Sequence, residues 1–485
     1  MRYLVAESVS LKPHLETAGE VALQALSDGH EVSFAWLGEH LPWSDWRLPA
    51  IAHWVGCSLE RREHRFERLL AQEGVSVLGR AVDDPAWQTE IAEWSQRFTG
   101  DLEGLKQYSY HGVALGAGAA SSLISYTGNS RYEPLEDLER VRACLAAALL
   151  VYLRAAWAIR ACRPDVVITF NGRFATSKPI VAAAEQAGIV VLRHERGCTY
   201  SHYEIFSDAI HNFGYIRRRI QQSWAAADPQ DRVLLGHQFF QRRRSGDGIG
   251  WYSFTAGQEK GLVPARTFGK RRLVYFSSSD DEYAAVADAY EPGPWPDQLS
   301  AVQDLIVAHS AYTDLELVIR VHPHLVKKSD AERRRWAQLG QTGVRVIAPN
   351  ENVDSYALID TADLVASYGS TIGMEAAYWG KPGILLGPCA YRGSGAVFEP
   401  ADKKEIEALL DPQRPLFAPP QERCLPYGHY FLTYGRKFRY YVPESLSEGR
   451  LLGQRLGWDP WPIHQLRRMH VGKFYRNVKN FLNKA

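Results

Sequence analysis

The stretch DLVASYGSTIGMEAAYWGKPGILLG, from Asp363 to Gly387, contains the features that decide the fold. Its apolar run Asp363–Ser367 predicts a buried strand, Thr371–Trp379 a helix, and Gly383–Gly387 the next strand. A strand, a helix and a second strand of such lengths form a βαβ unit, in which the two strands are parallel. The stretch therefore predicts a parallel sheet covered by helices.

The same alternation extends in both directions along the chain. Near-continuous apolar runs, typical of strands buried on both faces, alternate with helical segments and with Gly- or Pro-containing breaks. We expect strands at 2–7, 32–38, 165–170, 189–195, 273–279, 315–321 and 344–347, and helices at 15–27, 135–162, 177–187, 283–288, 298–310, 330–339 and 353–360.

This alternation of strands and helices predicts an α/β chain with two doubly wound, Rossmann-like domains that face each other across a cleft. The expected first domain covers residues 1–265 and carries a helical insertion at 41–134, which is rich in Trp, Arg and Glu. The expected second domain covers 266–412. A helical, basic extension, 413–485, is expected to pack back on the first domain or to lie on a membrane, because its end, 466–485, combines basic residues with one apolar helical face.

Composition excludes several classes of protein. The 485 residues are 46% hydrophobic and 23% charged, with a formal net charge of +1, so neither a disordered chain nor a nucleic-acid coat is expected. The six cysteines contain no C-x-x-C pair, which favours a reducing compartment. The N-terminus lacks a signal-peptide pattern, so we expect a cytoplasmic protein.

In such domains ligands bind beyond the carboxyl ends of the strands, so polar residues placed there are candidates for a site. His322-Pro323 ends one predicted strand, and an imidazole held by proline is suited to donate a hydrogen bond to a phosphate. Ser370 and Thr371 begin the helix of the deciding stretch, where free N–H groups and the helix dipole attract an anion. Alternatively, His322 satisfies a loop carbonyl and Ser370 is only a helix cap.

Two further groups follow from the same reasoning. Glu375, in the same helix, is predicted to accept hydrogen bonds from the two ribose hydroxyls, with a solvent-facing glutamate as the alternative. Ser277, Ser278 and Ser279 end another strand and suit close approach of a phosphate or sugar, whereas Asp280 either contacts a sugar or caps the next helix. This segment has no D-x-D pair, so we expect no metal and no cofactor besides the donor.

In the first domain, Glu195 lies at a predicted strand end and is our candidate general base or carboxylate nucleophile. A structural ion pair between Glu195 and Arg196 or Arg173 is the alternative. Arg196 directly follows Glu195, and Asn171 and Arg173 follow the neighbouring predicted strand; all three are candidates for contacts to a sugar substrate.

The pattern His322-Pro323, Ser370-Thr371, Glu375 and Gly380-Lys381-Pro382 resembles bacterial GT-B glycosyltransferases of the capsule and lipopolysaccharide type. More narrowly it is similar to Kdo and sialic-acid transferases, whose His-Pro and Ser-Ser/Thr motifs bind the phosphate of a CMP-sugar. Glu195-Arg196-Gly197 is similar to their acidic catalytic motif, although an arginine replaces the second acidic residue of the sialyltransferases. Residues 41–134 have no counterpart in the resemblance.

The resemblance implies transfer of an ulosonic acid from CMP to a glycan or glycolipid acceptor, without a metal ion. An arginine, Arg173 or Arg196, would then suit the sugar carboxylate. The sequence leaves three alternatives to a CMP-sugar transferase: a UDP- or GDP-sugar transferase, a CDP-glycerol-type transferase, and a non-catalytic two-lobed binding protein. No nucleic-acid partner is expected, and residues 466–485 are the candidate contact with an anionic inner membrane.

Overall fold

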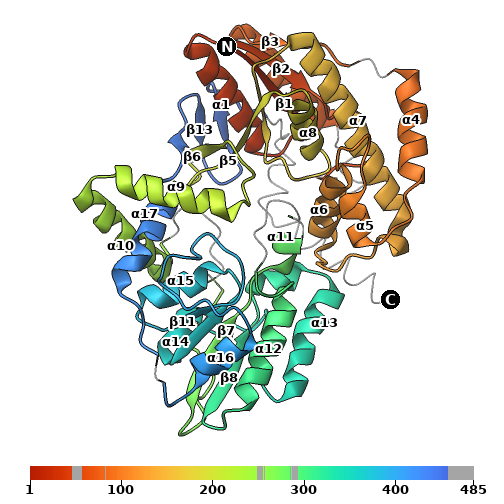
Figure 1. Ribbon diagram of the computed structural model, residues 1–485. Coiled ribbons are helices and arrows are strands. Elements are labelled where there is room, and N and C mark those ends of the chain that lie inside the picture. The colour runs from red at the N-terminus through yellow and green to blue at the C-terminus, as the bar shows by residue number, and fades with distance from the viewer. Residues whose placement is uncertain are drawn as a thin grey trace.

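The computed structural model describes residues 1–45, 57–81, 84–247, 255, 257–284, 286, 293–414 and 416–456. It divides into two α/β domains, drawn one above the other in Figure 1. The predicted basic segment 466–485 lies outside the described residues.

The first domain is built on a seven-stranded sheet of order β12-β6-β5-β4-β1-β2-β3. The strands from β3 to β5 are parallel and have the Rossmann order 3-2-1-4-5, whereas β6 and β12 extend the sheet in antiparallel pairings. The strands are β1 (Arg2–Glu7), β2 (Glu31–Trp36), β3 (Ser76–Val77), β4 (Val166–Phe170), β5 (Val190–Arg196), β6 (His202–Phe206) and β12 (Arg436–Lys437).

The helices of this domain cover both faces of its sheet. They are α1 (His14–Ser27), α3 (Cys57–Gln72), α4 (Pro85–Gln96), α5 (Leu102–Gln107), α6 (Gly116–Thr127), α7 (Leu138–Cys162), α8 (Lys178–Gln186), α9 (Phe213–Ala226) and α10 (Pro229–Ser245). The helical stretch Pro134–Cys162, which contains α7, is long and apolar enough to pass as a membrane span, but 67% of its most apolar window is buried inside the protein.

The segment 41–134, predicted as a helical insertion, contains the helices α3 to α6 and also one strand of the sheet. Ser76–Val77 forms β3, which pairs in parallel with β2. Helix α3 precedes β3 along the chain, so this segment completes a βαβ unit of the sheet, and the part that is added to the Rossmann pattern is the shorter segment from α4 to α6. A strand of two residues is too short to produce an apolar pattern, which is why the sequence did not reveal it.

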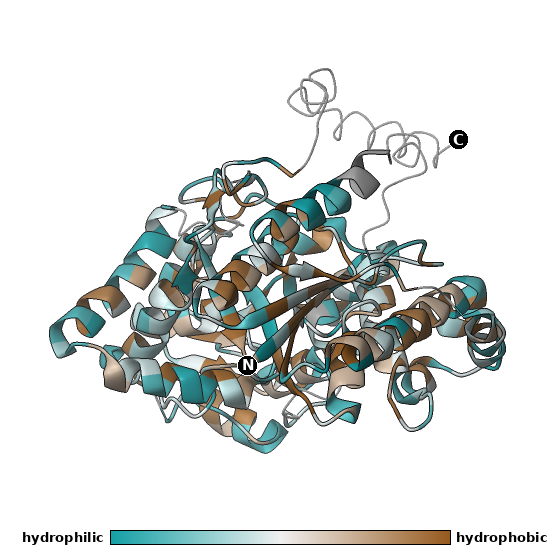
Figure 2. Ribbon diagram, turned by 90° about the horizontal axis from the view of Figure 1, so that it is seen from above, coloured by the Kyte–Doolittle hydropathy of each residue, from teal (hydrophilic) through white to brown (hydrophobic). Residues whose placement is uncertain are grey.

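The second domain is built on a five-stranded parallel sheet of order β11-β10-β7-β8-β9, again the order 3-2-1-4-5. Its strands are β7 (Arg271–Phe276), β8 (Leu315–Arg320), β9 (Arg345–Ile347), β10 (Leu364–Ser367) and β11 (Gly383–Leu385), and its helices are α11 (Asp280–Ala284), α12 (Gln298–Ser310), α13 (Asp330–Gln338), α14 (Ser355–Thr361), α15 (Thr371–Tyr378) and α16 (Lys403–Leu410). Buried apolar strand residues form the cores of both domains. In the view from above, polar residues lie mostly on the outer faces of the helices (Figure 2).

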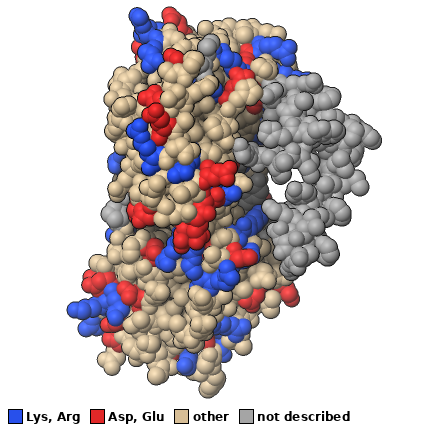
Figure 3. Space-filling view, turned by 90° about the vertical axis from the view of Figure 1, so that its right-hand side faces the viewer, with Lys and Arg blue, Asp and Glu red and all other residues tan. Residues whose placement is uncertain are grey.

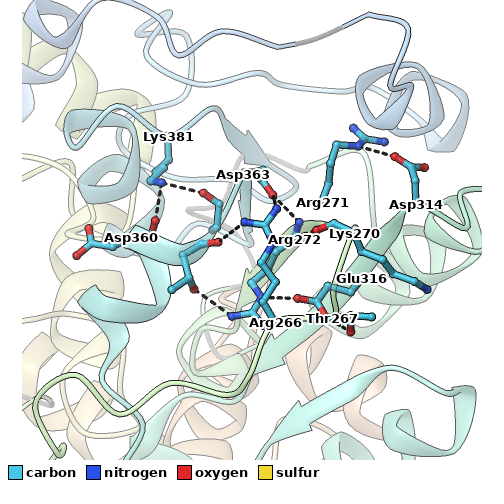
Figure 4. Close-up of polar contacts among 12 residues, drawn as sticks. Arg266, Thr267, Lys270, Arg271, Arg272, Asp314, Glu316, Asp360, Asp363 and Lys381 are labelled. Atoms are coloured by element: carbon cyan, nitrogen blue, oxygen red, sulfur yellow. Dashed lines mark hydrogen bonds and ion pairs between the residues drawn. The ribbon is translucent and has the colours of Figure 1, made fainter.

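A buried arginine ties the amino ends of three strands of the second domain together (Figure 4). Arg272, on β7, is 1% exposed, and its Nε donates to Glu316 of β8 at 2.5 Å. Its backbone N–H donates to Asp363, directly before β10, at 2.7 Å. Because this network lies at the edge opposite the carboxyl ends, it stabilises the sheet and leaves the other edge open for a ligand.

The chain returns to the first domain after α16. Helix α17 (Leu425–Thr433) contacts α9 and α10, β12 joins the first sheet, and the hairpin β13–β14 (Tyr441–Pro443, Gly449–Leu451) packs on α1. Figure 1 shows these blue elements running up one side of the molecule. Two Rossmann-like domains joined in this way are the GT-B arrangement, so the predicted fold class is confirmed.

Candidate active site

A cavity of about 320 Å³ lies along the carboxyl edge of the second sheet, and residues of the first domain close it. The strand order of this sheet reverses between β7 and β10, which is where doubly wound domains bind ligands. We call it the donor cavity. Its lining includes His211, Phe213, Ser278, Ser279, Tyr283, His322, His324, Gly369, Ser370, Thr371, Tyr391, Tyr427 and Phe431.

His322 enters the cavity from the end of β8. Its backbone N–H donates to the Ser277 hydroxyl at 2.8 Å, and its Nδ1 accepts from the His324 N–H at 3.2 Å. An imidazole whose Nδ1 accepts carries its proton on Nε2, so a neutral His322 is a donor through Nε2. Burial, with the neighbouring His324, lowers the pKa of His322 to about 4, which keeps the ring neutral at pH 7.

Helix α15 begins at the cavity. Ser370 occupies its N-cap position, and its hydroxyl makes no capping hydrogen bond. Gly369 has φ of +74°, and a Cβ atom there would lie 2.6 Å from the carbonyl oxygen of Pro388. Glycine is therefore required for the chain to turn from β10 into α15 and aim the helix start at the cavity.

The three serines after β7 have separate roles. Ser278 and Ser279 line the cavity, whereas Ser277 holds His322. The Ser279 hydroxyl donates to Asp281 at 2.7 Å, and Asp281 forms a largely buried ion pair with Lys328 at 2.5 Å. Lys328 was missed by the sequence reasoning, although the Lys327-Lys328 pair shortly after His322-Pro323 was a visible signal.

The first domain contributes His211 and Phe213, at the start of α9, to the cavity. Burial and the nearby Arg173 guanidinium lower the pKa of His211 to about 3. Arg173, a predicted site residue, therefore lies close behind this wall, with its guanidinium over the Phe174 ring at 4.5 Å. The sequence reasoning missed His211 and Phe213, because they become part of the cavity only when the two domains meet.

Glu195 lies at the carboxyl end of β5, among groups of the first domain. Its carboxylate accepts from Asn171 Nδ2 and from the Arg196 backbone N–H, both at 2.9 Å, and its side chain is 21% exposed. His14 Nδ1 lies 3.6 Å from Glu195 Oε1. Burial lowers the pKa of His14 well below its usual value, so a neutral ring faces the carboxylate. The structure thus groups Glu195, Asn171 and Arg196, apart from the residues that line the donor cavity.

The prediction that Glu375 binds the ribose hydroxyls is wrong. Its side chain is 1% exposed; Oε1 accepts from Arg243 Nε at 2.8 Å, and Oε2 accepts from the Tyr356 hydroxyl. Both oxygens are engaged by α10 and α14, so the carboxylate is not placed to bind ribose. Thr371, which lines the cavity, precedes Glu375 by four residues and so lies on the same side of α15; the contacts of Glu375 with α10 and α14, which the local sequence does not show, decide against the predicted role.

Replacing Glu375 with alanine should therefore reduce stability and leave nucleotide affinity unchanged. The substitution removes the acceptor of the Tyr356 hydroxyl and of Arg243 Nε, but the Arg243 side chain is 38% exposed and water can solvate its charge, so we expect a loss of about 2 kcal/mol. Urea denaturation measures this loss, and calorimetric titration with CMP measures affinity. Glu407→Ala, on α16, is the control. A weakened CMP affinity with intact stability would return Glu375 to the binding site.

Asp280 lies outside the donor cavity and lines a neighbouring one. Gln298 donates to its carboxylate, and burial raises the pKa of Asp280 well above its usual value. Among the residues that the structure describes, no group of three or more His, Cys, Asp or Glu side chains is arranged to hold a metal ion.

No family model and no curated protein matches this chain. Solved structures similar to it include the Thermosulfurimonas dismutans KpsC β-Kdo 2,4-transferase, with 13% identity, TM-score 0.37, and coverage of 55% of this chain and 79% of that one. Another is the Neisseria meningitidis UDP-GlcNAc 2-epimerase bound to UDP-GlcNAc, with 11% identity, TM-score 0.29, and coverage of 84% and 90%.

Proposed function

We propose that this chain is a GT-B glycosyltransferase that moves an ulosonic acid from a CMP-activated donor to a surface-polysaccharide or lipopolysaccharide acceptor. The observation that carries the proposal is that His322, Ser370 and Thr371, which come from two different strand ends, line one cavity. A donor imidazole, two hydroxyls and a helix start are the groups that stabilise a phosphate leaving group as it gains charge.

The size and walls of the cavity suit a nucleoside monophosphate. A volume of about 320 Å³ lies at the lower end of the range for small-ligand sites, about 300 to 1,000 Å³. Tyr391, Tyr427 and Phe431 offer aromatic surface for a base. Arg173, close to His211, offers a guanidinium for the carboxylate of an ulosonic acid.

A nucleotide panel tests this proposal. At a hundred times its dissociation constant CMP should stabilise the protein by about 2.7 kcal/mol, and UDP and GDP at equal concentration by much less. His322→Ala should weaken CMP binding by about tenfold or more, since it removes the imidazole donor. His64→Ala, whose side chain is 57% exposed outside the cavity, is the control.

The other outcomes identify the alternatives. Stronger stabilisation by UDP or GDP would favour a UDP- or GDP-sugar transferase. CMP binding without turnover of any CMP-sugar would favour a non-catalytic nucleotide-binding protein. Full CMP stabilisation of His322→Ala would remove His322 from the site.

A further inference from the structure

A second cavity, of about 660 Å³, lies beside the donor cavity and between the two domains. One wall is formed by α5 and the loop 130–135 of the first domain, and the other by α11 with the start of α12. Tyr283 and Val286 line both cavities, so the two share a wall. We call this second space the side cavity.

Polar contacts hold the first-domain loop 128–131 against the second domain and so fix the side cavity. The Ser130 hydroxyl donates to Glu332 at 2.9 Å, and Arg131 pairs with Asp297 at 3.0 Å. The Ser329 N–H donates to the Gly128 carbonyl at 3.3 Å. Figure 3 looks onto this side of the molecule and shows acidic and basic side chains close together at mid-height.

The lining of the side cavity combines aromatic rings with carboxylates. Tyr132, Tyr283 and Tyr368 supply the rings. Five acidic residues, Asp101, Glu103, Glu133, Asp280 and Asp297, line it together with two basic ones, Lys106 and Arg131. Both cations are paired within this lining, Lys106 with Glu103 at 2.6 Å and Arg131 with Asp297 at 3.0 Å.

This chemistry selects among possible ligands. Carboxylates accept hydrogen bonds from sugar hydroxyls and ammonium groups, and rings cover the apolar face of a sugar. The excess of acidic groups disfavours a second anion, such as a phosphate or a uronate. A neutral saccharide or an amino sugar can donate hydrogen bonds to the carboxylates and carries no negative charge.

We propose that the side cavity is the acceptor subsite, and that it binds the neutral or amino-sugar end of a glycan next to the donor cavity. The inference rests on the proposed function, because an acceptor site presupposes a transferase. It also gives a role to α5, within the added segment, and to the loop 130–135: they form the wall that recognises the acceptor.

Binding of trisaccharides to the full chain tests the proposal without requiring catalysis. Maltotriose and a glucosamine trimer should bind the wild type at millimolar concentration in ligand-observed NMR, and a galacturonate trimer should bind at least tenfold more weakly. Ala284→Trp, which fills the side cavity from α11, should weaken both favoured trimers about tenfold or more and leave CMP binding unchanged. Ala331→Trp, at an exposed position of α13, is the matched control.

A charge-reversal variant provides a second test that remains valid if Ala284→Trp fails to fold. Glu133 is exposed at the cavity wall, and Glu133→Arg should weaken the glucosamine trimer more than maltotriose, whereas Glu136→Arg, outside the lining, should change neither. Three results would overturn the inference: unchanged trimer binding in both cavity variants, no binding of the favoured trimers to the wild type, or a preference for the galacturonate trimer. Failure of CMP to bind, with the trimer results as expected, would instead refute the CMP donor of the proposed function and the acceptor role with it, and would leave the side cavity as a saccharide-binding site.

Discussion

Replacing Glu20 with alanine is expected to lower the free energy of unfolding by about 4 kcal/mol, near the upper end for a single substitution. Glu20 is fully buried in α1, and its carboxylate accepts from three successive backbone N–H groups, those of Arg439, Tyr440 and Tyr441, at 2.8, 2.7 and 2.8 Å. Alanine would leave all three without this charged acceptor, and each such loss costs about 1–3 kcal/mol.

The loss should appear in urea denaturation as a lower midpoint. Glu73→Ala, at an exposed position after α3, should change the midpoint little. Glu20→Gln should fall between the two, because the amide oxygen still accepts but without the charge. A loss below about 1 kcal/mol for Glu20→Ala would mean that the returning chain, from β12 to β14, is held mainly by apolar contacts such as those of Tyr441 and Leu451 with the α1 core cluster.

The role of Glu20 shows what kind of information the sequence does not display. Its partners lie about 420 residues away, and no local pattern relates a helix near the N-terminus to the segment that crosses back. Strand β12 was missed for the same reason, whereas β6 directly follows its partner β5 and was missed because its antiparallel pairing is not part of a βαβ pattern. The parallel strands were predictable because each is a buried apolar run: 315–321 was expected and β8 is Leu315–Arg320.

The site residues also differ in whether the local sequence could predict their positions. His322, Ser370 and Ser278 could be placed near one another because the ends of parallel strands meet at one edge of a sheet. His211 could not, because it becomes part of the cavity only where the two domains meet. Glu375 could not be placed either, because helical periodicity puts it on the same face as Thr371, and only the packing of α10 and α14 shows that its carboxylate is already engaged.

Glu195→Gln is expected to reduce kcat by about a thousandfold, within the range of about 10²–10⁴ for a lost general base, and to leave CMP affinity within about twofold. Under the proposed function the carboxylate either deprotonates the acceptor hydroxyl or attacks the anomeric carbon, and both roles need its charge. Asn171 Nδ2 and the Arg196 N–H hold the two oxygens in place, and glutamine retains the shape but not the negative charge.

Steady-state transfer from a CMP-sugar gives kcat, and calorimetric titration with CMP gives the affinity. Glu185→Gln, whose side chain is 60% exposed on the first domain and pairs with Arg193, is the matched control and should keep full activity. Asn171→Ala should lower kcat less than Glu195→Gln, because it removes one hydrogen bond to the carboxylate and leaves its charge. Glu195 does not line the donor cavity, so loss of both CMP binding and kcat in Glu195→Gln would indicate a structural role. If Glu195→Gln keeps more than about a tenth of the wild-type kcat, Glu195 is excluded as the base or nucleophile.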